Sequence, residues 1–441
     1  MASLNPKTTE KEFFGMFGAL GIPIFLPLLI IFFQLITNSH YAIKGISLDL
    51  SKVIEQIPQS WSELADICFD KKCWVVYLVW FFVLAVFDVY SPGRDVEGVE
   101  LRDGTKLMYR INGRFMSSLL VVIIVARAFA SENFYLPELQ FLYDNQLQLT
   151  MVTIIFSFLL SFFVYFCSFI PLRRPNGAKT NERILSINGN SGNAIYDWFI
   201  GRELNPRIGS WDIKLFCELR PGMLLLFLIN LSCLHQQYHT QGKVADSMWL
   251  VNAMQAFYIF EGVLNEEGCL TMMDIATDGF GFMLAFGDLA WLPWSYSLQA
   301  RYLALPGNAY HLGWLKCSLI LLVNVLGYYI FHSANQQKSD FKQGKLKHLK
   351  SITTPTGSKL LADGWWSTSQ HINYFGDWLI GWSWCLPTGT MTLLTYFYVI
   401  YFGVLLVHRQ TRDEAKCRNK YGKAWEEYEK QVPYKIVPYV Y

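Results

Sequence analysis

The chain has 441 residues, of which 52% are hydrophobic, 16% aromatic and only 16% charged, and its formal net charge is +2. Soluble domains carry roughly 25% charged residues, so too few charges remain to cover several water-facing surfaces, and a disordered or collagen-like chain is excluded. The near-zero net charge gives no support to a nucleic-acid binder. The composition predicts a membrane protein.

Long apolar runs recur along the whole chain, and a run of about 20 residues is what a helix needs to cross a bilayer. The first follows a short N-terminal tail, residues 1–16, and is too continuous for a cleaved signal sequence. Two weaker runs, 281–300 and 371–387, contain Gly, Pro, Trp and polar residues, which is typical of helices packed inside a bundle. We expect eight to ten helices in all. The clear runs are 17–37, 73–90, 115–131, 149–172, 221–236, 248–265, 313–332 and 388–408.

Three segments are strongly basic and bear on orientation. Segment 173–183 holds four cations against one acid, segment 338–359 holds six lysines against one acid, and the tail after residue 408 is also rich in Lys and Arg. The positive-inside rule places such segments in the cytosol. The alternative to a functional role is that these cations only set the topology.

Polar side chains interrupt the apolar sequence between residues 257 and 301, where charges are costly and usually mark function. Three of them, Glu261, Asn265 and Asp274, lie near one helical face if the helix is unbroken. The alternative is that the acids pair with Arg or cap helix ends. We also expect Gly279, Gly281 and Gly287 to permit close helix packing. The full polar set comprises Glu261, Asn265, Glu266, Glu267, Asp274 and Asp278, followed by Asp288 beside Trp291 and Trp294.

Segment 199–222 mixes acids and cations next to an apolar run, and Asn205-Pro206 and Pro221-Gly222 are turn signals. Opposite charges at this density favour pairing within a re-entrant loop, although a functional role stays open. Nine cysteines occur, with no C-x-x-C pair and no Cys/His metal spacing. We therefore expect reduced, mostly buried thiols and no metal site.

The last helix and the tail beyond it interleave cations with aromatic residues. Arg409, Arg412, Asp413 and Lys416 recur at helical spacing, and tyrosines and a tryptophan follow. Guanidinium groups bind phosphates and aromatic faces stack on flat rings, which suits a dinucleotide. No G-x-G-x-x-G follows a strand, so this would not be a Rossmann site. An amphipathic tail on anionic lipid has the same spacing.

Four blocks of the sequence resemble the sterol reductase family. They are LLVHRQTRDEAKCRNKYG (405–422), GWWSTSQHINYFGDW (364–378), FIGRELNPRIGSWDIKLFCELRPG (199–222) and MMDIATDGFGFMLAFGDLAWLPWSYSLQARYL (272–303). The family includes delta-14, delta-7 and delta-24(28) sterol reductases and the membrane part of lamin B receptor. The closing VPYKIVPYVY looks most like the delta-14 branch. Many relatives have Arg-His where this chain has Gln370-His371, whereas yeast delta-14 enzymes look similar to this chain in having Gln at that position.

The resemblance implies an all-α, polytopic protein of the endoplasmic reticulum membrane, with about ten transmembrane helices. It implies three regions: a tail (1–16), N-terminal helices and loops (17–220), and C-terminal helices and tail (221–441) that form the NADPH and sterol pockets. The cofactor pocket would open to the cytosol, as would the C-terminal tail. By matching motif, the residues around NADPH would be Lys338, Lys342, Trp366, His371, Asn373, Tyr374, Asp377, Arg409, Asp413, Cys417 and Tyr428.

The activity implied is reduction of the C14=C15 bond of a sterol 8,14-diene drawn from the bilayer. A proton added at C-15 leaves a cation at C-14, which hydride from NADPH quenches. The protein must supply the acid, a dry pocket and groups that stabilise the cation. We expect the acid among Glu261, Asp274, Asp278 and Tyr296, with Asp288 ranked below them.

Other readings of the chain remain open. The alternative that fits best is the same reduction at the delta-7 or delta-24(28) double bond of the sterol. A non-catalytic scaffold, a membrane methyltransferase and a transporter fit less well, because the N-terminal tail is short, the chain is long and no repeat occurs. The expected partners are the sterol, membrane lipid and other sterol-pathway enzymes, without nucleic acid.

Overall fold

The computed structural model describes residues 3–38, 42–44, 47–171, 182–309, 311–390 and 392–441, and the chain divides into two compact units. The first unit comprises residues 1–244 and 255–308, and the second comprises 245–254 and 309–441. Most of basic segment 173–183, including Arg173, Arg174 and Lys179, lies outside the described residues.

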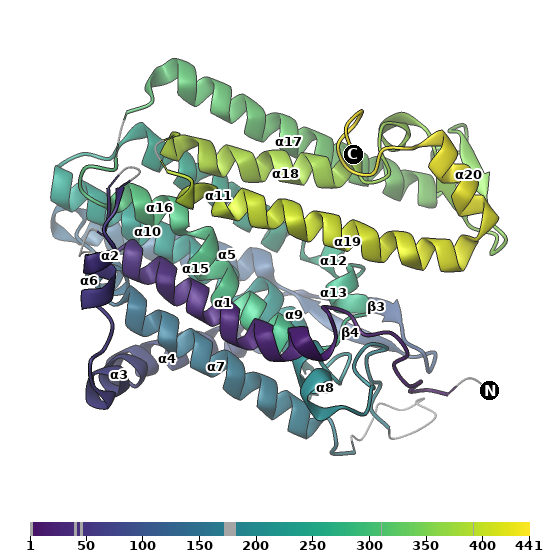
Figure 1. Cartoon of the computed structure of the whole chain (residues 1–441), viewed down its shortest axis with the longest axis horizontal. Coiled ribbons are helices and arrows are strands. Elements are labelled where there is room, and N and C mark those ends of the chain that lie inside the picture. The colour runs from purple at the N-terminus through teal and green to yellow at the C-terminus, as the bar shows by residue number, and fades with distance from the viewer. Residues whose placement is uncertain (1–2, 39–41, 45–46, 172–181, 310, 391) are drawn as a thin grey trace. The chain divides into compact units, whose positions relative to one another are not determined.

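The first unit is almost entirely helical, with short antiparallel hairpins between helices (Figure 1). Helix α10 packs against α6, α15 and α16, and α7 packs against α1, α4 and α14. The elements are α1 (Met16–Ile36), β1 (Ile43–Lys44), β2 (Ser47–Leu48), α2 (Leu50–Glu55), α3 (Trp61–Cys68), α4 (Lys71–Tyr90), β3 (Arg94–Glu100), β4 (Lys106–Ile111), α5 (Gly113–Ala130), η1 (Glu132–Phe134), α6 (Pro137–Asp144), α7 (Gln146–Cys167), α8 (Ala194–Ile200), β5 (Arg207–Ile208), β6 (Trp211–Asp212), α9 (Ile213–Leu219), α10 (Pro221–Gln241), α12 (Glu266–Cys269), α13 (Met273–Ala276), α14 (Phe282–Phe286), η2 (Gly287–Trp291), α15 (Leu292–Tyr296) and α16 (Leu298–Ala304).

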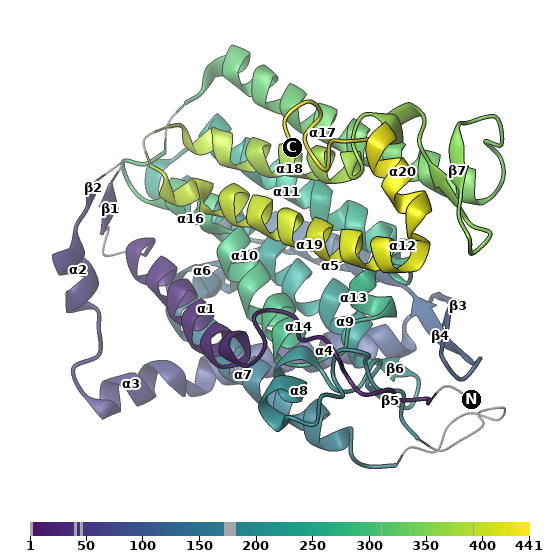
Figure 2. The same cartoon turned by 45° about the vertical axis from the view of Figure 1, so that its right-hand side comes forward.

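Helix α11 (Asp246–Leu264) belongs to both units. In the second unit, α17, α18 and α19 run side by side, and α20 crosses the end of α19 (Figures 1 and 2). A hairpin of β7 and β8 follows α17 and packs against α20. The elements are α17 (Gly313–Lys342), β7 (Ser351–Thr353), β8 (Lys359–Leu361), η3 (Gly364–Ser367), α18 (Ile372–Cys385), η4 (Leu386–Thr388), η5 (Leu394–Tyr396), α19 (Phe397–Tyr421) and α20 (Lys423–Gln431).

Among the described residues, six helical segments are long and apolar enough to cross a membrane: 16–36, 61–90, 113–130, 146–167, 213–241 and 313–342. On α17, Leu315, Leu319 and Leu322 are exposed while Ile320, Gly327 and Ile330 are buried, so one apolar face points away from the core. Exposed apolar faces of this kind fit a lipid environment. The chain is thus a multi-pass membrane protein, and the larger count of about ten helices stays a prediction.

The weaker runs differ from simple spans. Run 281–300 is divided into α14, a π-helical turn (η2), α15 and α16, and run 371–387 becomes α18, which has only 14 residues. Run 388–408 begins as helix only at Phe397, because the chain first passes through short 3-10 turns after Pro387. Gly and Pro in these runs end or bend the helix, as their conformational properties require.

Two of the three glycines expected to allow close packing do so. A Cβ on Gly279 would lie 1.9 Å from the backbone oxygen of Gly201, and a Cβ on Gly281 would lie 2.4 Å from the Gly201 nitrogen. Gly201 itself has φ of +98°, which favours glycine. The expectation for Gly287 is wrong, because a Cβ there would meet no atom within 4 Å.

Candidate functional site

Within the second unit, Lys338 of α17 and Trp366 of η3 meet directly. The Lys338 Nζ lies 4.0 Å from the centre of the Trp366 ring, which is a cation–π contact. The indole is itself fixed, because Trp366 Nε1 donates a hydrogen bond of 2.9 Å to the backbone oxygen of Ala334. The structure therefore brings together two of the predicted cofactor residues and holds the lysine cation in one place.

Asp413 of α19 is a carboxylate that interacts with predicted cofactor residues from several elements of the second unit. Its Oδ2 lies 3.8 Å from His371 Nε2. It also interacts electrostatically with Lys338 from α17 and with Cys417 and Tyr428, the latter on α20. One carboxylate thus faces predicted site residues from several separate elements.

His371 precedes α18 and is nearly enclosed. Its side chain is 7% exposed, and its ring stacks on Tyr374 with centres 4.8 Å apart. Burial lowers the pKa of His371 to about 4, against the opposing effect of Asp413. The imidazole is therefore neutral at neutral pH, with Nε2 lacking a hydrogen-bond partner.

Three buried polar atoms without partners come from four successive residues. They are Oε1 of Gln370, Nε2 of His371 and Oδ1 of Asn373. The Asn373 amide nitrogen is used, since it donates to Asn335 Oδ1 at 3.1 Å. Buried polar groups without partners are rare, so this set fits a bound molecule that carries amide groups. Lys338 and the exposed Lys342 at the end of α17 add the charge that phosphates need. The residues present therefore fit a dinucleotide.

The other predicted cofactor residues lie in the same unit. Burial raises the pKa of the Cys417 thiol to about 11 and raises that of the Tyr428 phenol, so both stay protonated at neutral pH. Tyr428 also packs against Trp425, with ring centres 5.1 Å apart. Asp377 and Arg409 are partly buried on α18 and α19.

The predicted proton donors lie in the first unit, and two of them do not share a helix. Glu261 accepts a hydrogen bond of 2.6 Å from Asn265 Nδ2. Helix α11 then ends, because Asn265 leaves the helical conformation at φ −98° and ψ 26°. Asp274 lies beyond this break on α13, so the expected single face through Glu261, Asn265 and Asp274 is wrong. Tyr296 packs with Met223 and Ile259.

Lys214 organises the turn that carries Asp278. The lysine is 0% exposed, and its Nζ donates hydrogen bonds of 2.7 Å to the backbone oxygens of Ile275 and Asp278. Asp278 is 3% exposed, and the buried Phe280 and Phe282 follow it. The sequence places Lys214 among the opposite charges of segment 199–222, and no local pattern indicates that it reaches residues more than sixty positions later.

Most other charges of segment 199–222 form buried ion pairs. The pairing expected within the segment is found for Arg207 and Asp212, whereas Glu203 and Arg220 pair with residues outside it. Arg207 Nε lies 2.8 Å from Asp212 Oδ2. Arg220 is 1% exposed and bridges Glu266 and Asp88, the latter at 3.2 Å. The partners of Arg220 lie on α12 and α4, which the spacing within the segment does not indicate.

Asp288, which the sequence ranks below the four predicted donors, is also buried. It lies in the π-helical turn η2, and its Oδ2 is buried without a hydrogen-bond partner. Single π-turns inside helices are rare and often mark functional sites. In the sequence, the feature that points to Asp288 is a carboxylate after Gly287, among aromatic residues.

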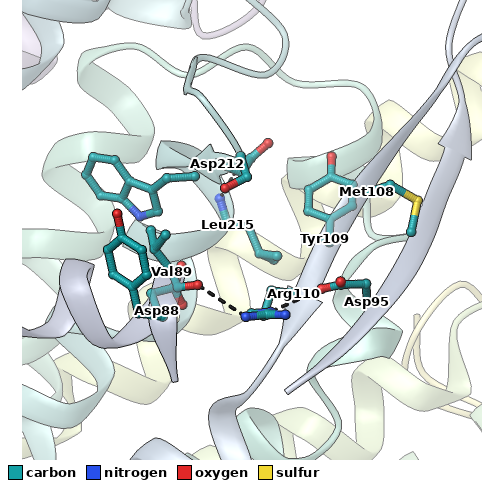
Figure 3. Close-up of a pocket in the computed structure, with 11 residues that line it drawn as sticks. Asp88, Val89, Asp95, Met108, Tyr109, Arg110, Asp212 and Leu215 are labelled. Carbon is teal, nitrogen blue, oxygen red and sulfur yellow. Dashed lines mark hydrogen bonds and ion pairs between the residues drawn. The ribbon is translucent and has the colours of Figure 1, made fainter. Parts of the chain in front are cut away.

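Two cavities in the first unit are lined by none of the predicted proton donors or cofactor residues, although Asn265, which donates to Glu261, lines the second. One of about 320 Å³ is lined by Asp88, Asp95 and Asp212, with Tyr109 and Arg110 on β4, and Figure 3 shows these side chains around it. The other, of about 540 Å³, is lined by Arg94, Arg114 and Glu266 among others. Arg110 pairs with Asp95 at 3.1 Å, so the acids of the first cavity are already partnered in part.

The sequence matches the Ergosterol biosynthesis ERG4/ERG24 family over residues 7–441. The chain belongs to this family. It is similar to Delta(14)-sterol reductase ERG24 of Candida albicans, with 66% identity over 100% of this chain and 99% of that protein. The corresponding protein of Saccharomyces cerevisiae is 56% identical over the full length of both chains. Delta(14)-sterol reductase erg24 of Schizosaccharomyces pombe is 45% identical over 98% of this chain and 97% of that protein.

The resemblance inferred from the four sequence blocks is confirmed by this match. Family members catalyse sterol reduction, so the chain is an oxidoreductase acting on a sterol double bond. The departure at Gln370 also has a structural explanation. Its Nε2 donates to the backbone oxygen of Val432 at 2.9 Å, so the side chain binds the chain's own C-terminal segment.

Proposed function

We propose that this chain is an NADPH-dependent delta-14-sterol reductase of ergosterol biosynthesis, which reduces the C14=C15 bond of a sterol 8,14-diene. The observation that carries the proposal is the 66% identity, over the whole chain, to a protein of that name. The delta-7 and delta-24(28) reactions remain the alternatives within the family. A purely structural role is less well supported, because the named relatives are reductases along their full lengths.

NADPH supplies a hydride when it is bound. The chain's own residues hold and orient it, and we assign Lys338 and Lys342 to the phosphates because they are cations at the end of one helix. His371 and Asn373 would orient the nicotinamide end through their unpaired buried atoms. The remaining residues of this site, as inferred from the family motifs, are Trp366, Tyr374, Asp377, Arg409, Asp413, Cys417 and Tyr428.

The sterol reaction needs a proton at C-15 and protection of the cation left at C-14. Glu261, Asp274, Asp278 and Tyr296 are the proposed acids, and Asp288 is a fifth candidate because of its unpaired buried oxygen. We rank Asp278 first, because it is the most buried of the original four and its turn is held by Lys214. Burial of this acid is consistent with the dry pocket that the reaction needs.

We also propose an endoplasmic reticulum location, about ten membrane helices, a cytosolic C-terminal tail and a cofactor pocket in the region 221–441. The basic segment 338–359 supports the orientation through the positive-inside rule. The sterol would come from the bilayer, and association with other sterol-pathway enzymes is a further expectation.

The proposed activity can be tested with membranes that contain the protein, NADPH and an 8,14-diene sterol. Conversion to the 8-ene, followed by mass spectrometry and by loss of the conjugated-diene absorbance, is the expected result. Turnover of a 5,7-diene or a 24(28)-ene instead would move the specificity within the family. Inactivity on all three sterols would contradict a reductase role.

Replacing Asp413 or Arg409 by Ala should weaken NADPH binding by tenfold or more. Asp413 balances the charge of Lys338 and faces His371, and the Arg409 guanidinium is proposed to bind phosphate. A titration of NADPH into purified protein measures the dissociation constant directly. Asp340→Asn is the matched control, since Asp340 is on α17 but pairs with Lys345 at 3.0 Å at the surface. Unchanged NADPH affinity in both alanine variants would remove these residues from the proposed site.

A further inference from the structure

The C-terminal segment Val432–Tyr441, here called the C-terminal strap, is bonded to the residues that precede α18. The backbone nitrogens of Gln370 and His371 donate to the backbone oxygens of Tyr434 and Lys435, both at 2.8 Å. Two side chains add to this ladder. Ser369 Oγ donates to the Ile436 oxygen and Gln370 Nε2 to the Val432 oxygen, each at 2.9 Å.

The C-terminal strap is also fixed to α19, the helix that carries Asp413. Lys435 forms an ion pair with Glu414, and Tyr441 Oη donates to Gln410 Oε1 at 3.3 Å. Gln410 in turn donates to Glu414 Oε2 at 2.7 Å. Residues 410 and 414 lie one turn apart, so the strap contacts a single face of α19.

The C-terminal strap is closed on itself and partly buried. The backbone oxygen of Tyr441 accepts hydrogen bonds from the nitrogens of Lys435, Ile436 and Val437, at 2.8, 2.8 and 3.1 Å. Val432 is buried in a cluster with Trp425 and Tyr428, and Ile436 is buried as well. These contacts make the strap a defined element, able to fix what it touches.

We propose that the C-terminal strap positions His371 beside Asp413 and that NADPH binding depends on this placement. The proposal rests on the proposed function, because it assigns the strap a role in that same site. His371 is held in two ways. Its backbone nitrogen is bonded to the strap, and its side chain faces Asp413 on α19, the helix to which the strap is anchored. The side-chain nitrogen of Gln370 adds to this attachment, since Nε2 donates to the backbone oxygen of Val432.

Detaching the strap should therefore displace His371 while the side chains of His371, Asn373, Lys338 and Lys342 stay unaltered. Gln370→Glu and Lys435→Met also leave an acceptor oxygen at the position of the unpartnered Gln370 Oε1, so a direct contact made there is kept. The double variant Ser369→Ala/Gln370→Met removes two strap hydrogen bonds without changing the charge, and Gln370→Glu turns a carboxylate oxygen toward the Val432 oxygen. Lys435→Met removes the ion pair with Glu414, whereas Lys435→Arg retains it. Lys430→Met and Ser367→Ala are matched controls, since both residues are exposed on the neighbouring segments.

The experiment measures the NADPH dissociation constant, kcat with the 8,14-diene, and hydrogen exchange of the backbone amides of Gln370 and His371, which donate to the strap, in the full-length protein. We expect the double variant and Gln370→Glu to weaken NADPH binding at least fivefold and to lower kcat at least tenfold, with faster exchange. Lys435→Met should weaken binding about threefold, Lys435→Arg should restore it, and both controls should match the wild type. The dissociation constant of the folded fraction does not depend on how much protein has folded, so a general loss of stability would leave it unchanged.

Faster exchange in Gln370→Glu with an NADPH dissociation constant within twofold of the wild type would overturn the proposal. Failure of Lys435→Arg to restore what Lys435→Met loses would also count against it. A wild-type protein that binds NADPH but converts no sterol would contradict the proposed function alone, because the effect of the strap on NADPH affinity would still be measurable.

Discussion

Replacing Asp278 by Asn should lower sterol conversion at least about a hundredfold, because a positioned general acid contributes roughly 10²–10⁴ to a rate. Asn has nearly the same shape but carries no transferable proton. Asp278 is 3% exposed, and the Lys214 ammonium holds its backbone oxygen at 2.7 Å. The turn should therefore keep its conformation in the variant, and the NADPH dissociation constant should stay at the wild-type value.

Glu261→Gln is the matched comparison for this prediction. Glu261 is partly exposed, and its carboxylate already accepts the Asn265 amide at 2.6 Å, so we expect conversion within threefold of the wild type. Initial rates with saturating NADPH and an 8,14-diene distinguish the two variants. If Asp278→Asn retained more than a third of the wild-type kcat, Asp278 would be excluded, and Asp274, Asp288 and Tyr296 would be tested next.

Replacing Arg220 by Met should destabilise the protein by about 3–5 kcal/mol, the usual cost of breaking a buried ion pair by removing one partner. Arg220 is 1% exposed and pairs with Glu266 and Asp88, and its Nη2 donates to Asn112 Oδ1 at 3.0 Å. Without the guanidinium, the carboxylates of Glu266, which is 1% exposed, and Asp88, which is 16% exposed, are left without this cation. Chemical unfolding in detergent micelles measures the loss.

Arg94→Met is the control for Arg220→Met, since it removes the same charge from an exposed pair. Arg94 pairs with Glu267, and their side chains are 69% and 52% exposed. Exposed pairs contribute about 0–1 kcal/mol, so this variant should unfold near the wild-type denaturant concentration. Equal losses in the two arginine variants would show that burial does not decide the strength of the Arg220 network.

The local sequence predicted where the long helices lie better than it predicted where they begin and end. The apolar runs at 17–37, 115–131 and 313–332 correspond to α1, α5 and α17, because a long apolar run has few other stable conformations. All nine cysteines are free, as their spacing predicted. Runs with internal Gly and Pro were less determined, since those residues permit several conformations and neighbouring helices select one.

The sequence by itself determined that this is a membrane protein of the sterol reductase family, because composition, apolar runs and motifs are local properties of the chain. Only the tertiary structure decided that Arg220 bridges Asp88 and Glu266, and that Lys214 holds the turn before Gly279. It also decided that Gln370 binds Val432. The partners in these pairs are 46 to 132 residues apart. Their pairing depends on how the helices pack, and helical periodicity carries no information about partners at such separations.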